Sequence, residues 1–315
     1  MTYSGTSVRT SSLWLAGHTA RPESGSIPNA EVIVVGAGLT GLVTAVLLAR
    51  GGKRVVVLEA RAPGACTTGN TTGKISLLQG TRLSTIARRQ SAETVRQYVE
   101  GNREGQAWLT QYCAERGVDV QYEDAITYAQ GRSGIPLARA EFDACAAAGL
   151  GVEWIDTLDV PFAFHGGVRL AEQVQFDPMP MLDALATELR ERGGRLVTGW
   201  RVHGASAAGG RVRLAVRSAE GAEDIAEADQ CVLATGTPVL DRGGYFARLE
   251  PSRFFCVSFS LPEPPPRTMM ICADFPTRSL RYALSRGAEQ LIVGGGGHIL
   301  GRKDSPRQTN PHING

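Results

Sequence analysis

One stretch near the N-terminus decides the fold, and it reads VIVVGAGLTG over residues 32–41. Its first four residues are apolar and β-branched, which is typical of a strand buried on both faces of a parallel sheet. Three glycines follow in the spacing G-x-G-x-x-G, and from Leu42 apolar residues continue as a helix that stops near Gly51. A second β-branched run covers residues 54–58. The stretch therefore predicts a strand, helix and strand of the dinucleotide-binding type.

Each glycine has a distinct role in such a turn. Gly36 permits the tight turn, Gly38 lets a pyrophosphate approach the backbone, and Gly41 lets the helix pack closely on the strand. The helix start adds free N–H groups and a partial positive charge, which favour phosphate. Glu59 stands about 20 residues further on, where a carboxylate accepts hydrogen bonds from ribose hydroxyls. A glycine-rich turn in an ordinary α/β fold is the alternative, and the agreement of strand, spacing and acid favours a dinucleotide.

The composition is that of a globular protein with a large core. The chain has 315 residues, 43% hydrophobic and 20% charged, and 33 basic against 31 acidic residues give a formal charge of +2. This balance argues against a dedicated nucleic-acid-binding protein, which usually carries a strongly basic patch. The 6 cysteines are scattered without C-x-x-C or Cys/His spacing. We therefore expect reduced thiols in a cytoplasmic protein, and no metal site.

The first 30 residues lack the basic start and apolar run of a secretory signal. They predict an N-terminal arm, residues 1–30, with Trp14 and Leu15 as its anchors. Residues 32–49 carry no charge, which hydropathy alone flags as a membrane helix. The glycine turn explains this stretch better, so we expect no membrane partner. Residues 302–315 are polar and without periodicity, and we expect a disordered tail there.

Periodicity also predicts the elements further along the chain. Residues 84–116 have the spacing of one long helix or two, which Gly101 and Gly105 weaken in the middle. Asp177 and Pro178 are a helix start, an N-cap residue with proline in the first helical position. Residues 195–228 predict a strand and a small antiparallel meander. Residues 230–234 then predict a second short buried strand.

The end of that strand bears on the choice between FAD and NAD, which share the first half-site. Flavoproteins place a strand ending in Ala-Thr-Gly beside the cofactor, where small residues let the backbone approach. Thr235 and Gly236 therefore favour FAD, and an NAD-dependent dehydrogenase stays as an alternative. Ser-His-Asp order, H-E-x-x-H and Walker-type loops are absent from the sequence, so hydrolase, metalloprotease and nucleotide-triphosphatase functions have no support.

Together these segments resemble the FAD-dependent oxidoreductases of the D-amino-acid oxidase and glycine oxidase superfamily. The resemblance rests on residues 32–41, 56–60 and 231–236. A narrower resemblance concerns the branch whose members often carry a C-terminal Rieske iron–sulfur domain. It rests on residues 69–74, 244–248, 276–281 and 294–298.

The resemblance implies a fold class and its division into domains. We expect an α/β fold in which a Rossmann-like FAD-binding domain is interrupted by an α+β substrate domain. The cofactor part would cover about residues 31–80 and 177–240. The substrate part would cover about residues 81–176 and 241–300.

The resemblance also implies which residues meet the cofactor. Val202 matches the position whose backbone contacts the adenine. Four threonines match a second loop that approaches the pyrophosphate and flavin, although a threonine-rich surface turn is the alternative. The full expected set is Gly36, Ala37, Gly38, Leu39, Thr40 and Gly41 in the turn, Glu59, Ala60 and Arg61 after the second strand, then Thr67, Thr68, Thr71, Thr72, Val202, Thr235 and Gly236.

The implied reaction is the oxidation of an amine or amino-acid-like small molecule by hydride transfer to flavin, with an unidentified electron acceptor. Lys74 is a candidate for stabilising reduced flavin, and Arg248 and Arg278 are candidates for binding a substrate carboxylate. A solvated surface lysine is the alternative for Lys74. Asn70 stands where many relatives carry His, and no Cys or His has a spacing that compels covalent attachment. We therefore expect noncovalent FAD.

The sequence departs from the resembled family at its C-terminal end. The family continues past the position of Gly315 through a strand and a glycine-rich helix start, and the Rieske ligand pairs C-x-H and C-x-x-H are absent from this sequence. We therefore expect a C-terminally truncated chain. A noncatalytic fold that binds a dinucleotide weakly, or not at all, stays as a third hypothesis.

Overall fold

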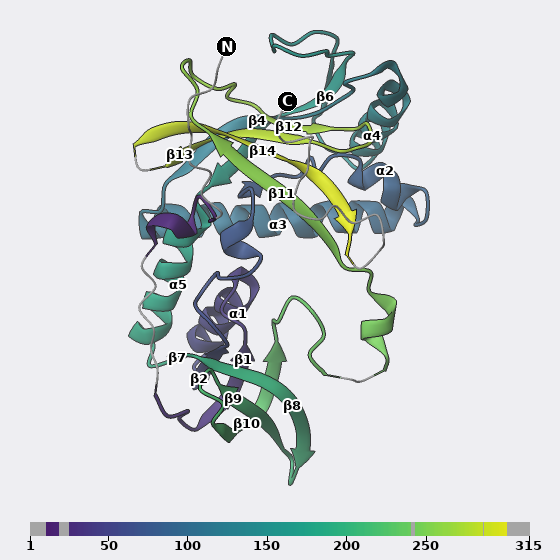
Figure 1. Ribbon diagram of the computed structural model, residues 1–315. Coiled ribbons are helices and arrows are strands. Elements are labelled where there is room, and N and C mark those ends of the chain that lie inside the picture. The colour runs from purple at the N-terminus through teal and green to yellow at the C-terminus, as the bar shows by residue number, and fades with distance from the viewer. Residues whose placement is uncertain (1–10, 19–24, 241–242, 286, 301–315) are drawn as a thin grey trace. The chain divides into compact units, whose positions relative to one another are not determined.

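The computed structural model describes residues 11–18, 25–240, 243–285 and 287–300 (Figure 1). These residues form two compact units. The first combines the described residues up to Thr71 with Pro178–Leu249, and the second combines Thr72–Asp177 with the described residues from Glu250 onward. The domain boundaries given from the sequence stay a prediction. The tail at residues 302–315 and much of the arm at residues 1–30 lie outside the described residues.

The first unit contains a six-stranded sheet of strand order β7-β2-β1-β10-β9-β8. Strands β7, β2, β1 and β10 are parallel, and β10, β9 and β8 form an antiparallel meander. The α/β class predicted from the sequence is confirmed. The elements are β1 (Ala30–Val35), α1 (Leu39–Arg50), β2 (Val55–Glu59), α5 (Pro178–Glu191), β7 (Arg195–Thr198), β8 (Trp200–Ala208), β9 (Arg211–Ser218) and β10 (Glu223–Leu233), with short 3-10 turns η1 (Leu15–Gly17), η2 (Thr68–Asn70) and η4 (Tyr245–Arg248).

Alternation along β1 places side chains on both faces of this sheet. Ile33 and Val35 pack in one cluster with Val202 and Leu214 of the meander, and all four are buried. Helices α1 and α5 lie against each other (Figure 1). Burial on both faces explains the continuous β-branched run that the sequence shows at β1.

Two sequence expectations in this unit need correction. The helix begins at Leu39, three residues before Leu42, because Gly38 already serves as its N-cap. The short buried strand expected at residues 230–234 is the end of the long strand β10, and Leu233 is 45% exposed. Strand β9 pairs with β10 only as far as Ala228, so the meander does not extend over this end.

The second unit contains a sheet of strand order β11-β14-β13-β12-β4-β6-β3, with β5 paired to β6. All pairs are antiparallel except β12 with β4. The strands are β3 (Lys74–Ile75), β4 (Val120–Tyr128), β5 (Glu153–Ile155), β6 (Gly167–Phe176), β11 (Ser252–Phe259), β12 (Met269–Cys272), β13 (Ser279–Ser285) and β14 (Ala288–Ile299), and the helices are α2 (Arg82–Ala87), α3 (Ala92–Arg116) and α4 (Ile135–Ala147), with the 3-10 turn η3 (Arg132–Gly134).

The second of the two alternatives for residues 84–116 is confirmed, because two helices, α2 and α3, cover this stretch. Ser91 caps α3, because its Oγ accepts a hydrogen bond from the N–H of Thr94 at 3.2 Å. The helix continues through Gly101 and Gly105. The buried carboxylate of Glu141 accepts hydrogen bonds from two N–H groups at the start of α2, so α4 fixes that helix start.

Within the described part of the chain, no helix combines the length and the hydropathy needed to cross a membrane. All six cysteines are free thiols.

Candidate cofactor site

The glycine turn between β1 and α1 leaves no room for side chains. Gly36 has a φ of +108°, and a Cβ there would lie 2.5 Å from the carbonyl oxygen of Ala234. A Cβ on Gly41 would lie 1.9 Å from the carbonyl oxygen of Gly36. The turn, the start of α1 and the segment after β10 are therefore in backbone contact, as a pyrophosphate-binding turn requires.

Glu59 fixes this turn from the end of β2. Its Oε2 accepts a hydrogen bond from the N–H of Ala37 at 2.8 Å, and its Oε1 accepts one from the N–H of Arg61 at 2.8 Å. An ionised carboxylate has about four acceptor positions. Each oxygen therefore retains capacity for a further donor, such as a ribose hydroxyl.

The threonine loop, defined here as residues 64–71, lies against the glycine turn. The N–H of Gly64 donates to the carbonyl oxygen of Ala37 at 3.1 Å. The N–H of Leu39, in the first turn of α1, donates to Thr68 Oγ1 at 3.1 Å. A hydroxyl that accepts a hydrogen bond can still donate its own proton. Thr68 is therefore held at the helix start with a donor available for an anion.

These groups fit the diphosphate of a dinucleotide. The first N–H groups of a helix carry a partial positive charge and attract anions. Gly38, the N-cap of α1, has no side chain, and a Cβ there would lie 3.2 Å from Thr68 Oγ1. The space beside Gly38, the N–H groups at the start of α1 and the Thr68 hydroxyl therefore lie together at the N-cap of this helix.

Most of the expected cofactor residues belong to the first unit. Thr40 and Thr67 are exposed, and Arg61 is exposed with its guanidinium on the thiol of Cys66. Thr72 belongs to the second unit. Those in the first unit are Gly36, Ala37, Gly38, Leu39, Thr40, Gly41, Glu59, Ala60, Arg61, Thr67, Thr68, Thr71, Val202, Thr235 and Gly236.

Of this set, Glu59 is hydrogen-bonded to Ala37 and Arg61, and Leu39 is hydrogen-bonded to Thr68.

Two other expected residues of the same unit are Val202, which lies in the core, and Thr235, which lies beside the glycine turn, because its Cα would be 3.7 Å from a Cβ on Gly36. Val202 is 5% exposed and belongs to the core cluster of the sheet. Thr235 Oγ1 donates to the carbonyl oxygen of Thr237 at 2.5 Å, which stabilises the turn after β10.

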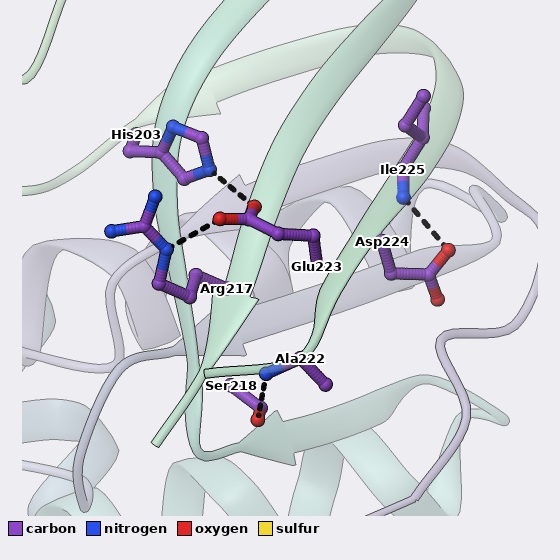
Figure 2. A network of polar contacts seen from close by, with 7 residues as sticks. All are labelled: His203, Arg217, Ser218, Ala222, Glu223, Asp224 and Ile225. Atoms are coloured by element: carbon purple, nitrogen blue, oxygen red, sulfur yellow. Dashed lines mark hydrogen bonds and ion pairs between the residues drawn. The ribbon is translucent and has the colours of Figure 1, made fainter. Parts of the chain in front are cut away.

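The meander that carries Val202 bears a network of polar contacts, shown in Figure 2. Glu223 accepts a hydrogen bond from Arg217 Nε at 2.5 Å and lies 3.0 Å from His203 Nε2. Arg217 holds the pKa of Glu223 below its usual range through a hydrogen bond, and His203 adds to this effect. Because all three side chains are well exposed, their contribution to stability is small.

The three candidates for catalysis are divided between the units. Arg248 belongs to the first unit, where its guanidinium lies 6.0 Å from the ring centre of Tyr245. Lys74 and Arg278 belong to the second. Arg278 is exposed and donates to Gln130 Oε1 at 3.3 Å.

Lys74 is half-buried on β3, and its Nζ donates to the carbonyl oxygen of Met270 at 3.2 Å. Burial, with the nearby charge of Arg281, lowers the pKa of Lys74 to about 7, against a smaller opposing effect of Cys256. A solvated surface lysine is thus the wrong description of this residue. An amine of this kind changes its charge near neutral pH.

Gly64 and Gly69 belong to the threonine loop, but neither is among the cofactor-binding residues expected from the sequence. Gly64 has a φ of +72°, and a Cβ on Gly69 would lie 2.4 Å from the carbonyl oxygen of Gly64. The two glycines flank Thr67 and Thr68 in the sequence, and this glycine pair around the threonines is the signal that could have identified them. Trp14 was expected as an anchor, but its partner in the loop could not be read from the sequence.

The sequence model of one protein family, described as FAD dependent oxidoreductase, matches residues 31–314. A curated relative is YhfW of Bacillus subtilis (strain 168), which carries the name of a Rieske 2Fe-2S iron-sulfur protein. The two sequences are 24% identical over 281 residues, which cover 86% of this chain and 53% of YhfW. The chain thus spans about half the length of this relative.

Several solved structures share the fold. L-proline dehydrogenase from P. horikoshii matches with a TM-score of 0.65 and 18% identity, over 91% of this chain and 75% of that chain. Glycine oxidase from Geobacillus kaustophilus matches with a TM-score of 0.62 and 16% identity, over 88% and 74%. L-alpha-glycerophosphate oxidase from Mycoplasma pneumoniae, with FAD bound, matches with a TM-score of 0.66 and 15% identity, over 91% and 76%.

Proposed function

Because this chain belongs to the family of FAD-dependent oxidoreductases, we propose that it oxidises an amine or an amino-acid-like small molecule, with FAD held noncovalently. The family match confirms the resemblance and the cofactor that the sequence predicts. The NAD-dependent alternative rested only on the half-site that the two cofactors share, and it now has no separate support.

The observation that carries the proposal is the convergence of three groups at the start of α1. The glycine turn offers backbone N–H groups without side chains, Glu59 offers carboxylate oxygens, and Thr68 offers a hydroxyl. In this proposal the turn and Thr68 bind the pyrophosphate, and Glu59 accepts hydrogen bonds from the ribose. When bound, FAD supplies the acceptor for the hydride of the substrate.

The substrate class is supported by the names of two of the similar structures. L-proline dehydrogenase and glycine oxidase are named for amino acids. The third is named for a glycerophosphate, whose reacting carbon bears a hydroxyl, so alcohols of this kind are the second candidate class. The chain's own contribution would be to orient the substrate, and Arg248 and Arg278 stay as proposed carboxylate-binding residues.

The test is substrate-dependent loss of visible flavin absorbance under anaerobic conditions. The purified chain is saturated with FAD and mixed with amino acids, secondary amines or glycerol phosphate in separate samples. Bleaching by an amino acid or amine supports the proposal, and bleaching by glycerol phosphate alone supports the second class. Bound FAD that no compound bleaches would support the noncatalytic hypothesis. Release of all flavin on denaturation would establish noncovalent attachment.

A further inference from the structure

The segment that precedes β1 packs directly on the threonine loop. From here on, the arm means residues 11–18 alone. Ser12 Oγ donates a hydrogen bond to the carbonyl oxygen of Gly69, and the indole N–H of Trp14 donates to the carbonyl oxygen of Thr71 at 2.7 Å. The backbone N–H of Trp14 in turn donates to Ser12 Oγ at 3.2 Å. Two carbonyl groups of the loop are therefore bound by one short segment.

Apolar contacts accompany these hydrogen bonds. Trp14 is 4% exposed, so its ring is buried. A Cβ on Gly69 would lie 2.7 Å from Leu15 Cδ2, so Leu15 sits directly on the loop backbone. Leu15 and the carbonyl oxygen of Gly64 therefore both lie where a side chain at position 69 would be, which explains the glycine there.

The other end of the arm is attached to α5. The ring nitrogen Nε2 of His18 lies 3.0 and 2.9 Å from the two carboxylate oxygens of Asp183. The same helix also contacts the loop, because a Cβ on Gly64 would lie 2.8 Å from Leu182 Cδ1. The loop is thus held between the arm and α5.

Hydrogen bonds also join the loop to the glycine turn and to the start of α1. The N–H of Gly64 donates a hydrogen bond to the carbonyl oxygen of Ala37, and Thr68 Oγ1 accepts one from the N–H of Leu39. Ordering a loop costs conformational entropy. Groups that order it before a ligand arrives therefore tighten binding.

We propose that the arm preorganises the threonine loop for FAD, with Ser12 and Trp14 as positioning residues of the cofactor site. The proposal rests on FAD binding at this site, as proposed above. The order that the arm imposes on the loop, however, is a property of the FAD-free protein and is measured separately.

The first test compares Trp14→Phe with Trp200→Phe. Phenylalanine keeps an aromatic ring at position 14 but removes the indole N–H. Trp200 is a matched control, because its indole N–H also donates to a backbone carbonyl of the same unit, that of Gly25 at 3.3 Å, which lies outside the loop. We expect W14F to weaken FAD binding between about twofold and tenfold, the effect of one lost hydrogen bond, and W200F to leave it unchanged.

Hydrogen exchange in the FAD-free protein gives the second readout. In W14F the amides of Gly69, Asn70 and Thr71 should exchange faster, while those of β1 and β2 keep their wild-type rates. If W14F does not fold, Ser12→Ala is the substitute variant. It removes the other hydrogen bond to the loop and should give the same exchange pattern in a folded protein. Unchanged exchange in the loop and unchanged FAD affinity in these variants would overturn the proposal.

A wild-type experiment separates this proposal from the FAD proposal itself. If FAD binds, added FAD should slow exchange both in the loop and in residues 12–16, and protection confined to the loop would contradict a role for the arm. If wild-type protein fails to bind FAD while W14F still loosens the loop, the cofactor proposal fails and the ordering role of the arm stands.

Discussion

The backbone N–H of Ala37 donates a hydrogen bond to the carboxylate of Glu59 at 2.8 Å. This one contact joins the turn after β1 to the end of β2. The second carboxylate oxygen accepts the N–H of Arg61, also at 2.8 Å. The acid that the sequence marks for a ribose therefore also fixes the shape of the glycine turn.

Replacement of Glu59 should affect both roles. Glu59→Gln puts an NH₂ group against one of two backbone N–H donors, and charge-assisted hydrogen bonds are worth about 1.5–3 kcal/mol each. We expect FAD binding to weaken by about tenfold or more, measured by titration of flavin fluorescence. Glu31→Gln is the control, because Glu31 also accepts a backbone N–H, that of Arg54 at 3.0 Å. Equal FAD affinity of E59Q and E31Q would contradict the assigned role.

Two glycine-to-alanine substitutions in helices should have opposite effects on stability. At Gly41 the new Cβ would lie 1.9 Å from the carbonyl oxygen of Gly36, so the helix start must move. At Gly101, in the middle of α3, no atom lies within 4 Å of the new Cβ. Thermal unfolding should show that G41A is less stable than wild type. It should show that G101A is more stable than wild type by about 0.5–1 kcal/mol. A G41A protein as stable as wild type would contradict the close packing of this turn.

A buried acid clamps the helix that carries the glycine turn. Glu188 of α5 is 1% exposed and accepts hydrogen bonds from Arg50 of α1 at 2.7 and 2.9 Å, and from Arg192 at 2.8 Å. The acid is buried although Arg50 and Arg192 are 31% and 41% exposed, so removing its charge costs more than breaking a fully exposed pair. Glu188→Gln should lower the free energy of unfolding by about 2–4 kcal/mol in urea denaturation. Glu93→Gln, which breaks an exposed pair with Arg96, should cost under about 1 kcal/mol. Similar losses in both variants would argue against the clamp.

The sequence predicts the local part of the site and misses its tertiary part. Gly36, Gly38, Gly41 and Glu59 could be found because their roles depend on fixed spacing within one βαβ unit. The contact of Trp14 with Thr71 depends on the path of a segment without periodicity, which no spacing encodes.

The same distinction explains the errors in the fold. Strand β1 was predicted well because burial on both faces leaves a continuous β-branched run. The exposure of Leu233 was missed because the apolar last residues of β10, 231–233, say nothing about where its neighbour β9 ends. The low pKa of Lys74 likewise arises from its surroundings, including Arg281, which stands far away in the sequence.

Lys74 should make stability depend on pH in a defined direction. Burial lowers its pKa from the usual 10.5 to about 7, so between these values the unfolded chain binds more protons than the folded chain. Stability therefore rises with pH across this window. Below pH 7 the buried Lys74 is charged, and the full loss of folding stability caused by this charge is present. Lys74→Met removes this destabilising charge. Its gain in unfolding free energy over wild type should be largest near pH 6 and should shrink toward pH 10.

The control for this measurement is Lys53→Met, which removes an exposed lysine. Its difference from wild type should not follow the same course with pH. A constant difference between K74M and wild type over the whole range would contradict a lowered pKa at Lys74.

FAD binding at the glycine turn is tested most directly by the visible spectrum of the purified chain, recorded before and after titration with FAD and again after denaturation. We expect one FAD per chain, bound through the glycine turn, with binding weakened in E59Q and the FAD released on denaturation. A colourless protein that fails to bind added FAD, although its thermal unfolding shows a folded state, would contradict it.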